Sequence, residues 1–485
     1  MNQEQMPIVD ALRKHKNKQP ISFHVPGHKN GEVIGRAGQA FFSKEMLQMD
    51  QTELTGLDDL HDAEGIIAEA QQLAADLYGA ESTLFLVGGS TAGNHAMILA
   101  SFQREDTVFV QRDVHKSIIN GLRLAGIRPV FLFPEYDQKT YLSKGLSVES
   151  VNLAFAKYPH AKGIILTSPS YYGWVPPLAP IIQKAHEKKM VVLVDEAHGA
   201  HFQSNDAFPA SALEQGADVV VQSAHKTLPA LTMGAYLHIG KESYISSQAV
   251  KEAAAVVQTS SPSYLVLSSL DMARYYVHTL RECEPNQLTR SYESFQADLE
   301  KNTGLSLVKA TEKIEQDPLK CIVKAPEGYS GWTLQHYLEQ EYIYSELADQ
   351  DHVLLVLPLR LEGNYLTVFP KFQQAVSTMM AQVPPENRTR VSHLPTFSVQ
   401  ETEREWLEMF HVKQKNIEVE RASGKIAGVD IIPYPPGIPL FFKGEKITGE
   451  RFSYLLEWVQ QGGRIQGGTV DRKGQWYVSI MDEDE

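Results

Sequence analysis

From about residue 80, short apolar runs alternate with longer amphipathic segments, and this alternation constrains the fold more than any other feature. The apolar runs are nearly continuous, which is typical of strands buried on both faces of a largely parallel sheet. Repeated strand–helix units of this kind predict a doubly wound α/β domain. The expected strands are 82–89, 107–111, 128–134, 162–170, 191–197 and 218–224, and the expected helices are 65–79, 92–103, 117–126 and 178–189.

The chain has 485 residues, which is too long for one ordinary core. After residue 257 the pattern changes: 264–300 is expected to be helical, and 304–380 mixes strands and helices. We expect a large domain with an N-terminal arm over 1–290 and a small α/β domain over 291–385. A C-terminal α+β domain is expected over 386–485, where the prolines of 422–448 exclude long regular elements.

Composition limits the cellular compartment and the classes of partner that we expect for the protein. The two cysteines, Cys283 and Cys321, form no metal spacing or disulfide framework, and the N-terminal region has no apolar signal segment. No stretch of 18 apolar residues is present. We therefore expect a cytoplasmic protein with no membrane partner. The net charge of −14 disfavours nucleic acid as a partner; it suits a cationic substrate, although solubility alone would also explain it.

Two polar residues at expected strand ends suggest covalent cofactor chemistry. Asp195 closes VVLVD, and Lys226 follows DVVVQSAH, with Ser223 and His225 beside it. The 31 residues from Asp195 to Lys226 leave room for one further helix and strand. A lysine can form an imine with the aldehyde of pyridoxal phosphate, and an aspartate can keep the ring nitrogen protonated. Either residue alone would be ordinary, because loop lysines are usually solvated and aspartates often cap helices.

A glycine-rich turn supplies a candidate phosphate site in the same sheet. The segment 87–93, VGGSTAG, lies where an expected strand meets an expected helix, and it offers the hydroxyls of Ser90 and Thr91. Backbone N–H groups at a helix start bind phosphate, and glycine allows a close approach. Taken alone, such a turn is more often a simple helix start. It is not a P-loop, because no Gly-Lys-Ser/Thr follows.

Further candidates surround these strand ends. His115 follows the expected strand 107–111 and could stack on a cofactor ring or transfer a proton; the alternative is a solvent-facing helix start. Ala197 is small enough to lie against a planar ring, while His198 could contact the cofactor or shape the turn, and Glu196 suits a structural role. The turn around Ser260 is rich in hydroxyls. His24 and His28 have no third ligand at a suitable spacing, so we expect no metal.

Eight segments together resemble the Orn/Lys/Arg decarboxylase family of fold-type I pyridoxal phosphate enzymes. They occur in the family's order between residues 24 and 448, so the resemblance covers nearly the whole chain. The segments are HVPGHKNG, LDDLHDAEGIIAEAQ, VGGSTAGN, QRDVHKSI, VDEAHGAH, QSAHKTL, TSSPSYLVLSSLD and YPPGIPLFFKGEKIT.

The resemblance implies a role for each matching residue. Lys226 would bind the cofactor aldehyde, Asp195 would hold the ring nitrogen, and His115 and Ala197 would lie on opposite faces of the ring. His115 or Lys226 would return a proton to the substrate Cα. The groups implied at the phosphate are Ser90, Thr91, Ser223 and His225.

The resemblance also implies an assembly and a reaction. Active sites of the family lie between subunits, so we expect a homodimer or a dimer of dimers in which Ser260 or Ser261 reaches the partner's cofactor. Glu445 is a candidate for substrate binding. The motifs begin at residue 24, as in the short form of Gram-positive bacteria, which lacks the wing domain. The implied reaction is decarboxylation of arginine, lysine or ornithine, with arginine slightly favoured, in polyamine biosynthesis.

Two other functions remain open. An aminotransferase on the same fold would hold the substrate α-carboxylate with an arginine in the plane of the ring, and no arginine stands out for that role. A catalytically silent binding protein on this scaffold would have no need to retain Lys226.

Overall fold

A computed structural model describes residues 1–311, 314–360, 363–385, 399–401, 412–434, 439–460 and 463–482. The chain forms two compact units, each built from two separate stretches of sequence. Unit 1 comprises 1–102 and 178–285, and unit 2 comprises 103–177 and 286–485. Among the described residues, no helix combines the length and apolar character needed to cross a lipid bilayer.

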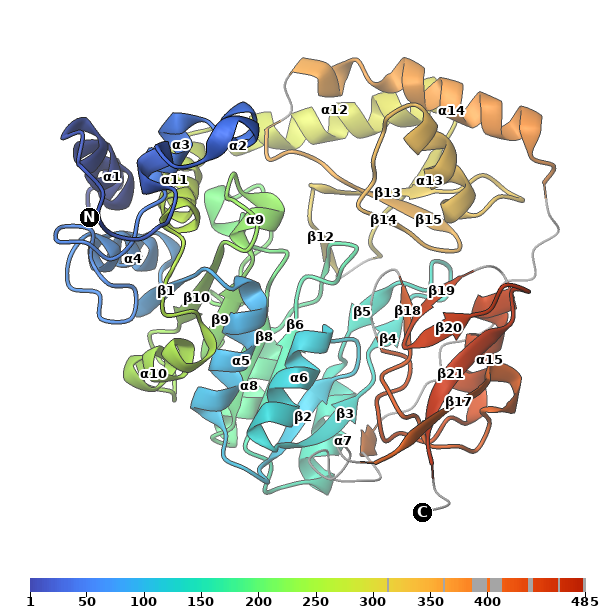
Figure 1. The fold of residues 1–485 in the computed structure, drawn as a ribbon. Helices are drawn as coiled ribbons and strands as arrows, with labels where there is room; N and C mark the ends of the chain where they lie inside the picture. Colours follow the sequence, from blue (N-terminus) through green and yellow to red (C-terminus); the bar gives the residue numbers. More distant parts are fainter. Residues whose placement is uncertain are drawn as a thin grey trace. The chain divides into compact units, whose positions relative to one another are not determined.

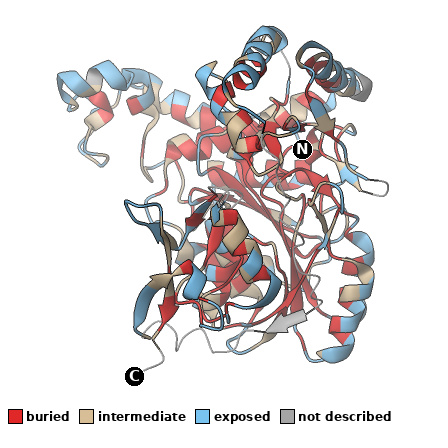
Figure 2. Cartoon of the chain, turned by 90° about the vertical axis from the view of Figure 1, so that its right-hand side faces the viewer, coloured by how far each residue is buried: buried red, intermediate tan, exposed pale blue. Residues whose placement is uncertain are grey.

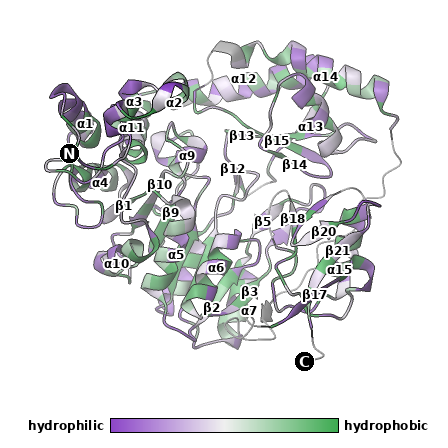
Figure 3. Ribbon diagram, viewed as in Figure 1, coloured by the Kyte–Doolittle hydropathy of each residue, from purple (hydrophilic) through white to green (hydrophobic). Residues whose placement is uncertain are grey.

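Unit 1 contains four neighbouring strands in the order β1 (Ser82–Leu86), β10 (Ala235–Ile239), β9 (Val219–Gln222) and β8 (Val191–Asp195). β8 and β9 are parallel, whereas β10 runs antiparallel to both of its neighbours. Nearly all of these strand residues are buried, and their hydropathy is high (Figures 2 and 3). Burial on both faces explains the continuous apolar runs in the sequence.

Several helices of unit 1, α5 foremost, pack on these strands. Helix α5 (Gly89–Ser101) packs closely on the sheet, and α10 (Ser247–Val257) packs against α5 (Figure 1). Short α9 (Ala224–Thr227) follows β9 directly. The other helices are α1 (Pro7–Asn17), α2 (Gly35–Phe41), α3 (Lys44–Met49), α4 (Ile66–Tyr78), α8 (Ala179–Glu187) and α11 (Tyr264–Arg281).

Gly93 makes the close packing of α5 possible. A Cβ at this position would lie 2.4 Å from Cγ2 of Val221 and 2.7 Å from Cδ1 of Leu86. We therefore expect Gly93→Ala to lower the free energy of unfolding by about 1–3 kcal/mol, because the helix must move away from the sheet. Thermal unfolding measures this loss. Gly27→Ala is the control, since no atom lies within 4 Å of its added Cβ, and equal melting temperatures for the two variants would contradict the packing.

Two elements of unit 1 differ from the sequence expectations. No α-helix lies between β8 and β9, where the chain forms only the short 3-10 helix η2 (Phe202–Ser204) and turns. The strand β10 was not expected, since the polar His238 interrupts its apolar pattern. The stretch 264–300 is helical as expected, with a break at 282–284 that divides it into α11 and α12 (Pro285–Thr303).

Unit 2 contains a second set of neighbouring strands in the order β6 (Gly163–Thr167), β2 (Thr107–Gln111), β3 (Arg128–Leu132) and β16 (Val399–Glu401). The first three are parallel, and β16 is antiparallel to β3. Helices α6 (Lys116–Ala125) and α7 (Val148–Lys157) connect them in sequence. Short pairs of strands flank this set: β4 (Glu135–Tyr136) with β5 (Ser143–Gly145), and β7 (Trp174–Val175) with β12 (Glu315–Gln316).

A four-stranded antiparallel sheet also belongs to unit 2. Its order is β11 (Ser306–Val308), β13 (Lys320–Lys324), β15 (His352–Val356) and β14 (Leu347–Ala348). Helices α13 (Gly331–Gln340) and α14 (Phe369–Gln382) pack against each other. This mixture of strands and helices agrees with the small α/β arrangement expected after residue 304.

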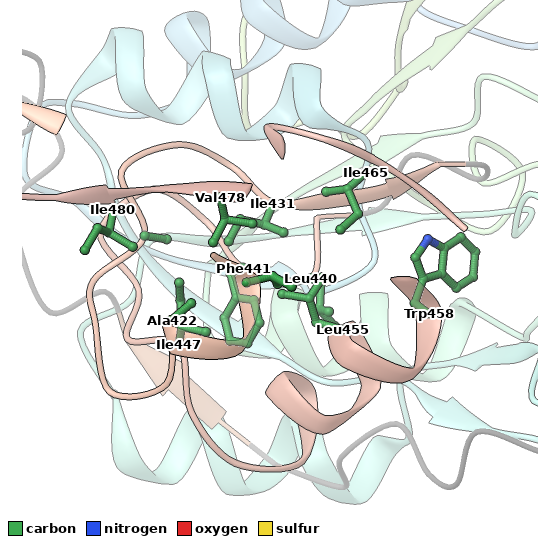
Figure 4. Close-up of a cluster of buried hydrophobic side chains, with 12 residues drawn as sticks. Ala422, Ile431, Leu440, Phe441, Ile447, Leu455, Trp458, Ile465, Val478 and Ile480 are labelled. Carbon is green, nitrogen blue, oxygen red and sulfur yellow. The ribbon is translucent and has the colours of Figure 1, made fainter. Parts of the chain in front are cut away.

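The C-terminal part of unit 2 has its own hydrophobic core. Strands β17 (Gln414–Glu418), β21 (Trp476–Met481) and β20 (Gly468–Val470) form one sheet, and β18 (Ile432–Tyr434) pairs with β19 (Arg464–Gln466). The side chains of Phe441, and of Leu455 and Trp458 in α15 (Gly449–Gln460), are buried in this core (Figure 4). Within the described part of 422–448 the longest strand has three residues, as the prolines predicted. The three domain limits remain predictions.

Candidate active site

Asp195, the last residue of β8, is held from two sides. Asn94 of α5 donates to its Oδ2 over 2.9 Å, and the backbone N–H of Ala197 donates to its Oδ1 over 3.1 Å. Both Asp195 and Asn94 are buried. The carboxylate is therefore oriented before any ligand arrives. Asn94 was not predicted to belong to the site, although its place four residues after Ser90 puts both residues on one face of the helix.

Lys226 lies on α9, directly after β9, and its side chain is exposed. Its Nζ is 3.1 Å from Nε2 of His198, which follows Asp195 by three residues. Since β8 ends at Asp195, strand alternation does not extend to His198, whose ring contacts the lysine. Between the two roles left open for His198, this contact favours a part in the site.

The predicted phosphate groups come from two elements of unit 1. Ser223 donates to Oγ of Ser90 over 2.7 Å, which joins the end of β9 to the start of α5. Gly89 has φ of +73°, a conformation that favours glycine, and its N–H donates to the carbonyl of Met233. Thr91 is exposed in the first turn. Near Lys226, the buried Oγ1 of Thr227 has no hydrogen-bond partner among the described residues.

His225 is held by the loop that precedes β10. Its backbone N–H donates to the carbonyl of Gly234 over 3.2 Å, and its Nδ1 lies 3.1 Å from the same oxygen. Burial lowers the pKa of His225, and the charge of Lys226 lowers it further. With Nδ1–H donated to Gly234, Nε2 can donate to a phosphate only when the ring is protonated. The predicted phosphate contact of His225 therefore requires the cationic ring.

The turn that contains Ser260 is anchored beside the start of the glycine segment. Gln258 accepts from the N–H of Val87 over 2.8 Å, and the carbonyl of Thr259 lies 2.9 Å from Nε2 of His61. Ser260 and Ser261 are both exposed. Their predicted reach into a partner subunit remains a prediction. Gln258 was not anticipated, because only the folded chain shows which backbone group it binds.

Two of the predicted residues belong to unit 2. His115 caps α6: its ring accepts from the N–H of Ser117 over 3.2 Å, and the side chain is exposed. This is the helix-start arrangement given above as the alternative for His115, and its contact with the cofactor ring remains a prediction. Among the described residues, no group of histidine, cysteine, aspartate and glutamate side chains is arranged to hold a metal ion.

Glu445 has a structural environment that the sequence did not suggest. The residue is 1% exposed, and its Oε2 accepts from Arg112 (3.1 Å), Arg451 (3.0 Å) and the N–H of Phe442 (2.9 Å). Arg112 also donates to the carbonyls of Pro439 and Leu440, and its guanidinium lies 3.8 Å from the ring centre of Phe442. The geometry favours a role in the core of unit 2 over direct substrate binding.

A substitution separates these two roles of Glu445. Glu445→Gln leaves the buried charges of Arg112 and Arg451 uncompensated, so we expect a loss of about 3 kcal/mol in the free energy of unfolding. Denaturant unfolding measures it. If Glu445 bound the substrate instead, the substitution would raise KM and leave the free energy of unfolding unchanged. That result would contradict the structural role.

Glu196 is buried beside the site and its pKa is strongly shifted. Burial raises the pKa to about 8, the charges of Glu214 and Asp195 raise it further, and hydrogen bonds from Gln222 and Ala212 lower it. The folded state therefore binds this proton more tightly than the unfolded state, whose carboxyl titrates near 4.5. The stabilisation is complete below about pH 4.5 and is lost as the pH rises to about 8.

This shift predicts a pH-dependent difference between Glu196→Gln and the wild type. The glutamine cannot ionise, so the variant should gain stability relative to the wild type between pH 5 and 8, by at most about 1.4 kcal/mol per pH unit. Melting temperatures of both proteins across that range measure the difference. Parallel curves would show that Glu196 keeps an ordinary pKa.

The arrangement in unit 1 fits pyridoxal phosphate by the chemistry of its groups. It provides an exposed primary amine at Lys226, an oriented buried carboxylate at Asp195, and hydroxyls at the start of a 13-residue helix. Helix N-termini favour phosphate, and a carboxylate stabilises a protonated ring nitrogen.

Comparisons with known proteins show relatives that match nearly the whole chain. Lysine decarboxylase LdcF of Francisella novicida superposes with a TM-score of 0.82 at 18% identity, over 98% of this chain and 81% of that one. Arginine decarboxylase of Bacillus subtilis is 32% identical over 96% of each chain. The uncharacterized protein YaaO of Bacillus subtilis is 41% identical over 98% of this chain and 99% of its own length.

The fold is that of the fold-type I pyridoxal phosphate enzymes, as expected. The model of the Orn/Lys/Arg decarboxylase major domain matches residues 6–314, and that of the C-terminal domain matches residues 387–475. The chain therefore belongs to the Orn/Lys/Arg decarboxylase family, whose members are pyridoxal phosphate-dependent decarboxylases of basic amino acids. The expected resemblance to the short Bacillus type is confirmed.

Proposed function

We propose that the protein is a carboxy-lyase that uses pyridoxal phosphate to decarboxylate a basic amino acid, with arginine the favoured substrate. The observation that carries the proposal is the assembly of the amine of Lys226, the oriented carboxylate of Asp195 and the Ser90–Ser223 hydroxyl pair within one unit. Family membership supports decarboxylation, and the arginine decarboxylases among the similar Bacillus proteins support the preference for arginine.

Each residue of the site would have a distinct part. When bound, the cofactor accepts the electron pair that carbon dioxide leaves behind. Asp195, held by Asn94, would keep the ring nitrogen protonated. Lys226 would bind the cofactor aldehyde covalently, and Lys226 or His115 would deliver the proton to Cα. His198 would orient the lysine amine through their 3.1 Å contact. Ala197 would leave room for the ring, and Thr91, His225 and Ser260 would add phosphate contacts.

The proposal includes the setting of the reaction. The product would be agmatine or a diamine, so the enzyme would serve polyamine biosynthesis in the cytoplasm. A homodimer or a dimer of dimers with shared active sites would complete the site. The free thiols of Cys283 and Cys321 support a reducing compartment.

A substrate panel tests the proposal. The protein, saturated with pyridoxal phosphate, is incubated separately with arginine, lysine and ornithine, while carbon dioxide and the product amines are measured. We expect carbon dioxide and amine in equal amounts, and most rapidly from arginine. Formation of a keto acid without carbon dioxide would contradict the proposal and favour an aminotransferase. The absence of both products from all three substrates would contradict enzymatic activity.

A further inference from the structure

A chain of four buried polar side chains crosses the strands of unit 1. Thr83 of β1 lies 2.8 Å from Nδ1 of His238 in β10, whose Nε2 lies 3.1 Å from Oε1 of Gln222 in β9. Nε2 of Gln222 then donates over 2.7 Å to Oε2 of Glu196, which follows β8. All four residues are at most 2% exposed. A buried polar group without a hydrogen-bond partner lowers the stability of the fold. Each of these four side chains therefore depends on its neighbours in the series.

The hydrogen bonds of this chain run in one direction. Both carboxyl oxygens of Glu196 accept, Oε1 from the N–H of Ala212 and Oε2 from the amide nitrogen of Gln222, so the amide oxygen of Gln222 faces His238. Burial lowers the pKa of His238 to about 3, so its ring is neutral and carries one N–H. That N–H must be at Nε2, which leaves Nδ1 to accept from the hydroxyl of Thr83. Tyr78 covers the ring of His238 at a centroid distance of 4.6 Å.

This series of four side chains lies near the strand ends that carry the candidate site, on the face of the strands opposite α5. Asp195 pairs with Val221, and α5 covers that face through the contact between Gly93 and Val221. Neighbouring residues of a strand point to opposite faces, so Gln222 lies on the other face. Gln222 directly precedes Ser223, and Glu196 directly follows Asp195.

The bond between Gln222 and Glu196 continues the pairing of β8 and β9 where their backbone ladder stops. The last backbone contact is from the N–H of Glu196 to the carbonyl of Val221, 2.9 Å. Oε1 of Glu196 also accepts from the N–H of Ala212 over 2.7 Å, so the carboxyl is fixed on both sides. Beyond this point follow the segments that bear His198 and Lys226, whose side chains lie 3.1 Å apart.

We propose that Glu196 and Gln222 are positioning residues, which hold the ends of β8 and β9 together and so set Asp195 and His198 at the correct separation from Ser223 and Lys226. This inference rests on the proposed function and deepens it, because it assigns a part to residues that touch neither cofactor nor substrate. The bond between Gln222 and Glu196 joins the segment that would hold the ring nitrogen to the segment that would hold the aldehyde, behind the contact between His198 and Lys226.

The far ends of the same strands provide a matched control. There, Asp218 at the start of β9 accepts from the N–H of Val192 in β8 over 2.7 Å and from Nε2 of His186 over 2.9 Å. Asp218 is 1% exposed, as is Glu196. Gln222→Met removes one donor from the buried carboxyl of Glu196 at the site end, and it also removes the acceptor of His238. His186→Phe removes one donor from a buried carboxylate at the opposite end.

Hydrogen exchange of the cofactor-free proteins is the first measurement. We expect Gln222→Met to accelerate amide exchange at least roughly tenfold in peptides that cover 195–202 and 222–229, as the loss of its buried hydrogen bonds implies. His186→Phe should leave those peptides unchanged and affect only the start of β8 and β9. The positioning role is overturned if both variants change the two peptides equally.

Cofactor attachment is the second measurement, with pyridoxal phosphate as the probe. The visible absorbance of the cofactor bound to Lys226 should require roughly tenfold more pyridoxal phosphate in Gln222→Met than in the wild type or His186→Phe. Equal requirements in the three proteins would overturn the inference. If the wild type shows no such absorbance while the exchange result holds, the proposed function fails and the positioning of the strand ends stands.

Glu196→Gln provides the conservative variant. Its amide can keep the oxygen toward Ala212 and turn its nitrogen toward Gln222, whose amide then reverses and donates to Nε2 of His238. The ring would carry its proton on Nδ1 and donate to Thr83, so every buried group keeps a partner. Exchange and cofactor absorbance should stay within about threefold of the wild type, whereas Glu196→Met should behave as Gln222→Met. Loss of both properties in Glu196→Gln would overturn the inference.

Discussion

Replacing Lys226 by alanine is expected to abolish covalent attachment of pyridoxal phosphate and to lower the rate of decarboxylation at least about a thousandfold, because this residue provides the nucleophilic amine. The free energy of unfolding should change by no more than about 0.5 kcal/mol, since the side chain is exposed. Visible absorbance, release of carbon dioxide and denaturant unfolding measure the three quantities.

Lys251→Ala is the matched control for this prediction. Lys251 is an exposed lysine of α10 in the same unit, and its removal should leave attachment and rate unchanged. A rate for Lys226→Ala within tenfold of the wild type would contradict the proposed role, whether or not the visible absorbance persisted.

Replacing Asp195 by asparagine should have the second largest effect. The neutral amide cannot stabilise a protonated ring nitrogen, so we expect kcat to fall roughly 10²- to 10³-fold, in line with the removal of other preorganised electrostatic groups. The cofactor should still attach, because Lys226 is untouched. Single-turnover release of carbon dioxide, measured beside the visible absorbance, separates the two effects.

Asp218→Asn controls for the structural cost of this change. Asp218 is also a buried aspartate that accepts backbone N–H donors beside β8 and β9, but it lies at the end of β9 away from Ser223 and α9. It should lose stability with little change in kcat. Equal losses of kcat in the two variants would indicate that Asp195 acts only through the stability of the fold.

The strands could be predicted from the sequence because buried strands consist mostly of apolar residues. The six expected runs match β1, β2, β3, β6, β8 and β9 to within three residues at either end. The strand β10 was missed because it has no continuous apolar run. It contains the polar His238, which belongs to the buried series of hydrogen-bonded side chains. Tertiary hydrogen bonding, which local pattern does not report, overrides the hydrophobic signal there.

Some residues of the candidate site could be predicted from the sequence, and others could not. Asp195 and Lys226 could be predicted, because strand ends in α/β sheets collect functional residues. Gln222 and Gln258 could not, since each acts through a partner more than 25 residues away. The position of Asn94 shows that it shares a helix face with Ser90, but only the fold shows that it binds Asp195. The motif around Glu445 suggested only that this residue belongs to the site. The folded unit shows that two arginines enclose its carboxylate.

The most direct test of the central claim is the site of covalent cofactor attachment. The protein is incubated with pyridoxal phosphate, reduced with borohydride, digested and mapped by mass spectrometry. The account predicts one stoichiometric adduct on the peptide that contains Lys226, and none on that peptide's counterpart in Lys226→Ala. A stoichiometric adduct on another lysine, or no adduct at all, would contradict it.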